Sequence, residues 1–189
     1  IGFHFGTSLA NQSHKTRIQN VSEELEYKNV LGINIGVNYK RRLGKNRYLV
    51  TGLTFLQNGF QNDRKRFGDG SIALAKEITL NYLNVPVVLL LDSPQTRFGP
   101  NIKLGGYFSY LVGGEYEIIN SSFEGSLSER YQKFDYGLTG GIGIKYNRFT
   151  LNFIYNLGLN NIAEDGSNTF IESVIRNRSF NINIVYWVK

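Results

Sequence analysis

The chain has 189 residues, enough for one domain with a sizeable core, and no linker-like stretch divides it. We therefore expect a single domain covering residues 1–189. It contains no cysteine, which excludes a disulfide scaffold and a thiolate metal site. The net charge is +6, but the basic residues fall mainly in connections such as 41–47 and 64–66 and form no aromatic-interleaved face, so nucleic acid is not an expected partner. We expect such connections to lie beside lipid phosphate groups instead.

Apolar residues alternate with small or polar residues from the first residue onward, and this two-residue pattern recurs along nearly the whole chain. Residues 31–39 are apolar at every odd position and Gly or Asn at every even one. The strand-like segments, in chain order, are Ile1–Leu9, Val30–Lys40, Arg47–Asn58, Glu77–Leu91, Phe98–Gly114, Phe134–Tyr146, Phe149–Asn160 and Ser179–Val188. One face is large and apolar and the other is small or hydrogen-bonding, which is the pattern of a barrel with lipid outside and a polar interior.

The connections between these segments alternate in length. The short ones cover residues 41–46, 92–97 and 147–148, and the long ones cover 10–29, 59–76, 115–133 and 161–177. Outer-membrane barrels have short periplasmic turns and longer external loops. The sequence therefore predicts an all-β fold, namely an eight-stranded antiparallel up-and-down transmembrane β-barrel with short periplasmic turns and long extracellular loops. We expect it in the bacterial outer membrane, with both termini on the periplasmic side.

Aromatic residues are placed as two girdles would require, one at each boundary between lipid and water. Near the expected periplasmic ends of the strands lie Tyr39, Phe98, Tyr146, Phe149 and Tyr186. Near the outer ends lie Phe55, Tyr110, Phe134, Tyr136 and Tyr155. Because Tyr and Phe are common in all strands, the alternative is that this spacing carries no membrane signal.

An eight-stranded barrel is just wide enough for side chains to fill it, so we expect a filled, hydrogen-bonded interior with some ion pairing and no wide channel. The candidate inward residues are His4, Asn34, Asn38, Lys40, Lys103, Asp135, Lys145, Asn152, Asn156, Asn181 and Asn183. Glycines on the same face would let the wall close around them. The competing interpretation is a proton or ion path through these groups.

The sequence offers little evidence for a catalytic site. A lipid-modifying barrel would need a Ser or His held by a carboxylate. His4 is expected to face inward and make a structural hydrogen bond, and His14 lies in a polar connection beside Ser13 with Glu23 and Glu24 nearby in sequence. No nucleophile-elbow motif and no metal-ligand spacing is present. We therefore expect a protein that is not an enzyme, with no catalytic, cofactor-binding or metal-binding residues and no cofactor.

The fourth segment breaks the two-face pattern, because Pro86, Val88 and Leu90 make its inward face apolar as well. Proline removes one donor from a strand ladder, which normally implies an edge or a bulge. We expect a bulge at which aliphatic side chains seal the periplasmic half of the barrel. The alternative is a lateral docking seam for another protein in the membrane.

Three stretches resemble the PorT-like outer-membrane β-barrel family of Bacteroidota. They are Tyr82–Pro86, which is similar to the family's Tyr-Leu-acidic-Ile-Pro strand, Phe134–Gly143, similar to its Asp-x-Gly…Gly-x-Gly strand, and Tyr155–Ile162, similar to its Tyr-x-x-Gly-Leu-x-Asn-Ile strand. Asn84 stands where the family usually has an acidic residue. The resemblance implies an eight-stranded outer-membrane barrel and an association with secretion through the type IX system, and it supplies no catalytic residues.

We expect a non-enzymatic integral outer-membrane β-barrel protein that serves as a structural or accessory subunit of a complex in protein secretion or transport. The expected partners are outer-membrane lipid and other outer-membrane or secretion-system proteins. A soluble lipocalin-like ligand carrier is an alternative, which would require the large apolar face to point inward. A small lipid-modifying enzyme that uses His4 or His14 is another.

Overall fold

The computed structural model describes the backbone of residues 1–18, 21–25, 28–62, 65–66, 72–73, 76–93, 97–118, 124–126, 131–162 and 171–188. Side chains are described for residues 1–13, 28–61, 77–93, 97–115, 131–162 and 174–188. In this part of the chain, no α-helix is long and apolar enough to cross a bilayer.

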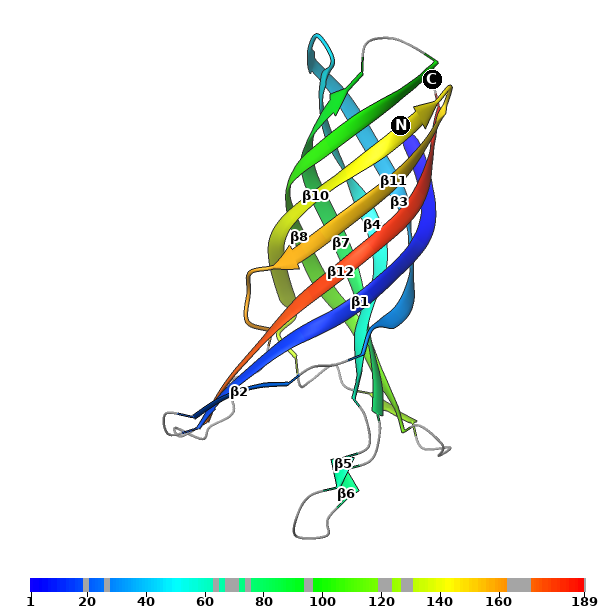
Figure 1. The fold of residues 1–189 in the computed structure, drawn as a ribbon. Coiled ribbons are helices and arrows are strands. Elements are labelled where there is room, and N and C mark those ends of the chain that lie inside the picture. The colour runs from blue at the N-terminus through cyan, green and yellow to red at the C-terminus, as the bar shows by residue number, and fades with distance from the viewer. Residues whose placement is uncertain are drawn as a thin grey trace.

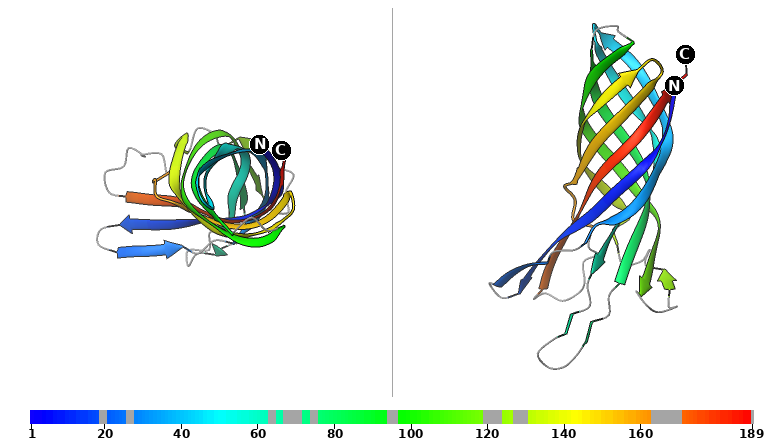
Figure 2. Two further views of the ribbon diagram at one scale, coloured as in Figure 1. Left: turned by 90° about the horizontal axis from the view of Figure 1, so that it is seen from above. Right: turned by 45° about the vertical axis from the view of Figure 1, so that its right-hand side comes forward.

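Eight long strands form a closed barrel (Figure 1). They are β1 (Gly2–Ile18), β3 (Val30–Gly44), β4 (Arg47–Asn62), β7 (Lys76–Asp92), β8 (Phe98–Ile118), β10 (Phe134–Tyr146), β11 (Phe149–Gly158) and β12 (Ile171–Trp187). Each strand pairs antiparallel with the next, and β12 pairs with β1 to close the ring. Figure 2 shows the ring from above. The predicted eight-stranded up-and-down barrel is confirmed.

Both chain termini lie at the same end of the barrel as the short turns, and we call it the turn end (Figure 1). Two of these turns have two residues, Lys45–Asn46 and Asn147–Arg148, between consecutive strands. Asn46 and Asn147 adopt the left-handed backbone region, with φ of 60° and 53°. Asparagine tolerates this region better than other residues with a Cβ, which is why it stands in tight hairpin turns.

The opposite end, which we call the loop end, carries four short strands. β2 (Val21–Leu25) pairs with β1, β9 (Glu124–Ser126) pairs with β8, and β5 (Lys65–Arg66) pairs with β6 (Ile72–Ala73). These short strands lie within the connections predicted as long loops, which therefore contain some regular structure.

Side chains alternate between a lipid-facing surface and the interior, as expected from the two-residue period of a strand. In β3, for example, Leu31, Ile33, Ile35, Val37 and Tyr39 are exposed and the residues between them are buried or half-buried. Leu31 and Leu104 are each 70% exposed. Soluble monomers rarely expose a large continuous apolar surface, so this band must contact lipid.

Several strands run further toward the loop end than the alternation predicts. The outward residues of β1 from Ile1 to Leu9 are apolar except for Thr7, but the strand continues to Ile18, and its partner β12 begins at Ile171 rather than Ser179. At about 3.3 Å per residue, β1 projects roughly 30 Å beyond its apolar segment. Beyond the lipid the outward face of a strand meets water, so the sequence there has no large apolar face to reveal a strand.

The strand containing Pro86 keeps its register, so the predicted bulge there is wrong. The ladder between β4 and β7 pairs Thr51 with Val87 and resumes at Thr54 with Asn84, without a shift. A shift occurs instead between β7 and β8, at Asn81 and Tyr82. The missing donor of Pro86 is accommodated by a local gap in the ladder.

Candidate functional site

The barrel interior, or lumen, is the candidate site, and an apolar cluster lies in each of its two halves. At the turn end, Val50, Val88 and Leu90 pack together with Tyr48 and Trp187. The inward apolar face of β7 therefore contributes to a packed cluster in this half of the barrel, and the seal itself stays a prediction. Close packing of this kind leaves little free cross-section in a small barrel.

The cluster at the loop end contains Leu80, Tyr82, Leu111 and Ile162, all at most 4% exposed. Ile162 does not belong to a strand but enters the lumen from the connection after β11, where its backbone N–H donates to the Ile175 carbonyl at 2.9 Å. The Ile175 N–H donates in turn to the Asn161 side chain at 2.8 Å. Asn161 and Ile162 are the last two residues of the Tyr155–Ile162 motif, and they place an apolar side chain inside the barrel.

Between the two clusters, amide side chains form a hydrogen-bonded network. Lys103 Nζ donates to Asn152 Oδ1 at 2.6 Å, and Asn152 Nδ2 donates to Asn183 Oδ1 at 2.9 Å. All three residues are buried. The candidate inward residues are all buried or half-buried in the structure, so the prediction of a hydrogen-bonded interior is confirmed.

His4 is part of this interior and contacts an amide rather than a carboxylate. Asn38 Nδ2 lies 3.0 Å from His4 Nδ1, which is the structural hydrogen bond that the sequence predicts. His14 lies in β1, not in a loop as expected, and its side chain is outside the described residues. Among the described residues, no group of three His, Cys, Asp or Glu side chains could hold a metal ion.

Three lysines point into the turn-end half of the lumen, and one carboxylate accompanies them. Lys145 Nζ forms an ion pair with Asp92 Oδ1 at 3.1 Å. Lys40 Nζ lies over the rings of Trp187 and Tyr48, at 4.4 and 4.9 Å from their centroids. Lys103, the third, has the amide partner described above. Ring faces attract cations, so the two rings help to stabilise Lys40.

A second polar group lies next to the loop-end cluster and centres on Asp135. Its Oδ2 accepts from Asn177 Nδ2 at 2.9 Å and from Tyr107 Oη at 3.3 Å. Gln12 Nε2 donates to Asn177 Oδ1 at 2.9 Å. Sequence reasoning missed Gln12 and Asn177, because both lie in segments predicted to be loops, although continuing the period of β1 and β12 would have placed them inside.

A cavity of about 70 Å³ remains in the lumen, lined by polar side chains that include His4, Lys103 and Asn183 and by apolar ones that include Val88 and Val185. That volume accommodates several water molecules. Glycine creates space for the amides around it. A Cβ on Gly143 would lie 2.6 Å from Asn152 Oδ1, and one on Gly36 would lie 2.7 Å from His4 Cε1.

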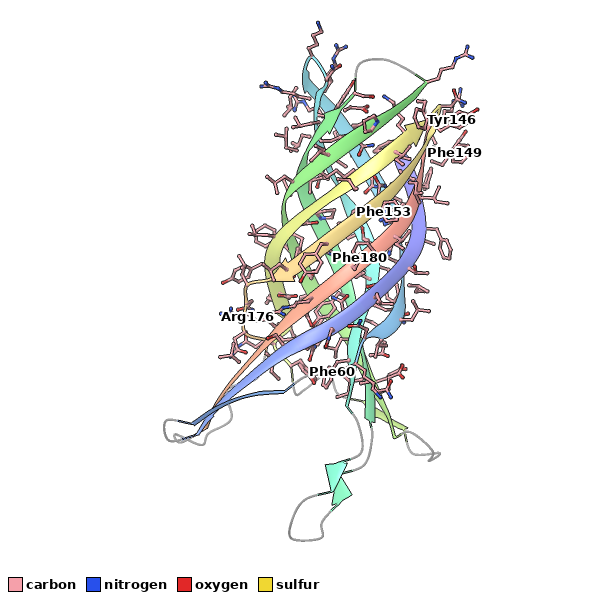
Figure 3. All side chains as sticks on the ribbon, viewed as in Figure 1. Phe60, Tyr146, Phe149, Phe153, Arg176 and Phe180 are labelled. Carbon is pink, nitrogen blue, oxygen red and sulfur yellow. The ribbon has the colours of Figure 1, made fainter. Side chains whose placement is uncertain are left out.

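Aromatic side chains follow the barrel wall at both boundaries of the lipid-facing band. At the turn end, the pairing register aligns Phe98 with Tyr146, Tyr146 with Phe149, and Phe149 with Tyr186. Phe149 and Tyr186 contact each other at 5.2 Å between ring centroids. Toward the loop end, Tyr110 and Phe134 make an edge contact at 5.2 Å. Figure 3 labels Tyr146 and Phe149 at the turn end and Phe153 and Phe180 further along the wall.

A closed antiparallel barrel with an apolar outer band and a polar interior defines an integral outer-membrane protein, because closure leaves no unpaired backbone group facing lipid. The model of the family described as outer membrane protein beta-barrel domain matches residues 1–164, and the chain belongs to that family. Its location is accordingly the bacterial outer membrane. The outward position of the apolar face also argues against the soluble carrier alternative.

Several solved structures match nearly the whole length of the chain. OprG from Pseudomonas aeruginosa is 10% identical, with 98% of this chain and 94% of that chain covered and a TM-score of 0.50. Neisserial surface protein A is 12% identical, with 97% and 96% covered and a TM-score of 0.44. Ail of Yersinia pestis is 12% identical, with 97% of each chain covered and a TM-score of 0.38. No curated protein matches the sequence.

Proposed function

We propose that this barrel is a non-enzymatic structural or accessory subunit of an outer-membrane complex in protein secretion or transport. The observation that supports the proposal is the pair of packed apolar clusters in the two halves of the lumen, because a packed barrel of this size offers no wide path for solute. Its function is then performed by its outer surface. The partners are outer-membrane lipid around the apolar band and other outer-membrane or secretion-system proteins.

The loop end is the surface we propose for protein partners. β1, β12 and β8 continue past the apolar band, and β2 and β9 add further strands there. Figure 1 shows β1 and β2 projecting from the barrel. Extended β-structure outside the lipid offers backbone edges and side chains to another chain.

Charge is distributed unevenly along the barrel axis and supports an orientation. The described residues of the turn-end half include one acidic residue, Asp92, although the sequence contains 15. The basic residues described there are Lys40, Arg41, Arg42, Lys45, Arg47, Arg97, Lys103, Lys145 and Arg148. Arg97 and Arg148 directly precede the girdle residues Phe98 and Phe149. We propose that this end faces the periplasm, with its outward arginines at the level of lipid phosphate groups.

The similarity of the three motifs to the PorT-like barrels of Bacteroidota supports a role in secretion. One of these motifs now has a physical role, because its final residue, Ile162, fills the lumen. We propose on this basis that the chain is a PorT-like barrel and that its complex belongs to a protein-secretion pathway.

Affinity isolation from membranes in mild detergent tests the proposed function. The wild-type chain should retain other outer-membrane or secretion proteins. A variant with residues 14–25, which include the paired ends of β1 and β2, replaced by a short Gly-Ser turn should lose them while still folding. As a control, replacing the turn Lys45–Asn46 by Asn-Gly should leave the same proteins bound. Recovery of the wild-type protein alone would contradict the proposal.

A further inference from the structure

The turn-end half of the lumen contains more positive charge than its own carboxylate can balance. Three inward lysines share Asp92, and that carboxylate is paired with Lys145. Lys40 has two aromatic rings as neighbours. Lys103 therefore remains as a buried cation whose described hydrogen-bond partner is a neutral amide, that of Asn152.

Burial makes this arrangement costly without a further partner. Lys103 is 8% exposed. A buried ammonium group loses its hydration, and a single neutral amide does not replace an opposite charge. Buried charges in folded proteins are normally paired. The structure thus calls for an anion close to Lys103.

Other donors line the same cavity. Asn152 donates to Asn183 Oδ1, which leaves the Asn183 amide nitrogen without a hydrogen-bond acceptor among the described residues. Asn38 Nδ2 lies 3.0 Å from His4 Nδ1, and with the amide as donor a neutral ring carries its proton on Nε2, which can then donate. Lys103, Asn183 and His4 all line the cavity.

We propose that the lumen cavity binds a small inorganic anion, of which chloride is the physiological example, through Lys103, Asn183 and His4. The cavity of about 70 Å³ admits a monatomic anion with part of its hydration shell and excludes a bulky organic anion. Asn34 Oδ1, a buried acceptor of the cavity wall without a partner among the described residues, suits a water molecule that hydrates the anion. The anion neutralises Lys103 and stabilises the folded barrel.

The full chain, folded in detergent in sodium chloride, bromide or gluconate at equal ionic strength, provides the test. The measurement is the midpoint temperature of the mobility shift on heating. Chloride and bromide should raise the midpoint by about 2–6 °C over gluconate, as expected for an anion at roughly tenfold its dissociation constant. The Lys103→Met variant should show no such difference beyond that of general salt effects. Lys45→Met removes an equal charge from an exposed turn and should retain the wild-type difference.

The distribution of bromide in crystals gives a second readout that does not depend on a variant. An anomalous peak in the lumen within contact of Lys103 Nζ would support the proposal. Equal midpoints for the wild-type chain in the three salts would overturn it, and so would equal anion dependence in the Lys103→Met and Lys45→Met variants. If Lys103→Met does not fold, the wild-type salt series and the bromide peak decide alone.

Discussion

Truncating Leu90 should cost more stability than truncating its lipid-facing neighbour Leu91. Leu90 is 4% exposed and packs against Val50 and Val88, whereas Leu91 is 43% exposed on the outer wall. Both Leu→Ala changes remove three carbons, a transfer cost of about 2.4 kcal/mol at roughly 0.8 kcal/mol each. Lipid refills the space at Leu91, but a cavity remains at Leu90, so we expect a total of about 3–5 kcal/mol for Leu90→Ala.

Urea titration of the barrel in lipid vesicles, followed by tryptophan fluorescence, measures the free energy of unfolding of each variant. The chain has one tryptophan, Trp187, which packs against the same turn-end cluster and reports on its integrity. Equal losses for Leu90→Ala and Leu91→Ala would refute the reasoning, because they would show that Leu90 is not held in a packed cluster inside the barrel.

Three further changes can be measured by the same titration. Gly143→Ala should lower the free energy of unfolding by about 1–3 kcal/mol, because the added Cβ would overlap a lumen amide. Gly140→Ala is the control and should be close to neutral, because the nearest neighbour of its Cβ would be 3.6 Å away. Similar losses for the two variants would contradict this prediction. Lys145→Met should cost about 1–3 kcal/mol because Asp92 loses its charged hydrogen-bond donor, although Lys40 and Lys103 remain as nearby cations. Adding Asp92→Asn should recover part of the loss, and no recovery would mean that the pair is not coupled. Asn147→Val should lower the free energy of unfolding by about 1–3 kcal/mol, because valine is strained in the left-handed backbone region that Asn147 adopts. Asn147→Gly should cause no such loss, since glycine adopts this region freely. Equal stability of the two variants would speak against a strained turn.

Most of the barrel could be predicted because lipid and lumen impose opposite demands on alternate residues. In β10, Leu138, Ile142 and Ile144 face outward, and Asp135 and Thr139 are buried inside. The predicted bounds Phe134–Tyr146 are those of the strand. A two-residue period together with short turns is sufficient to define such a strand.

The remaining features depend on contacts that no local period encodes. Ile162 lies outside any strand but packs in the loop-end cluster. Its position depends on a backbone hydrogen bond to Ile175, which lies beyond the rest of the connection between β11 and β12. The extensions of β1 and β12 are stabilised by pairing with each other. At Asn81 the pairing between β7 and β8 shifts by one position, because β8 contains one extra residue there. On both sides of this bulge, the inward residues of β7 still lie opposite inward residues of β8.

The ladder that joins the two ends of the chain has a consequence for how the barrel forms. β1 pairs with β12 along all of its 17 residues, so the most distant segments in the sequence share a long hydrogen-bonded seam. Such non-local pairing makes folding slow. Until β12 is present, β1 and β11 each expose an unpaired edge that can recruit other chains. A newly made chain therefore needs protection from aggregation until its last strand is available, and a chain that ends before β12 leaves an open sheet rather than a smaller barrel.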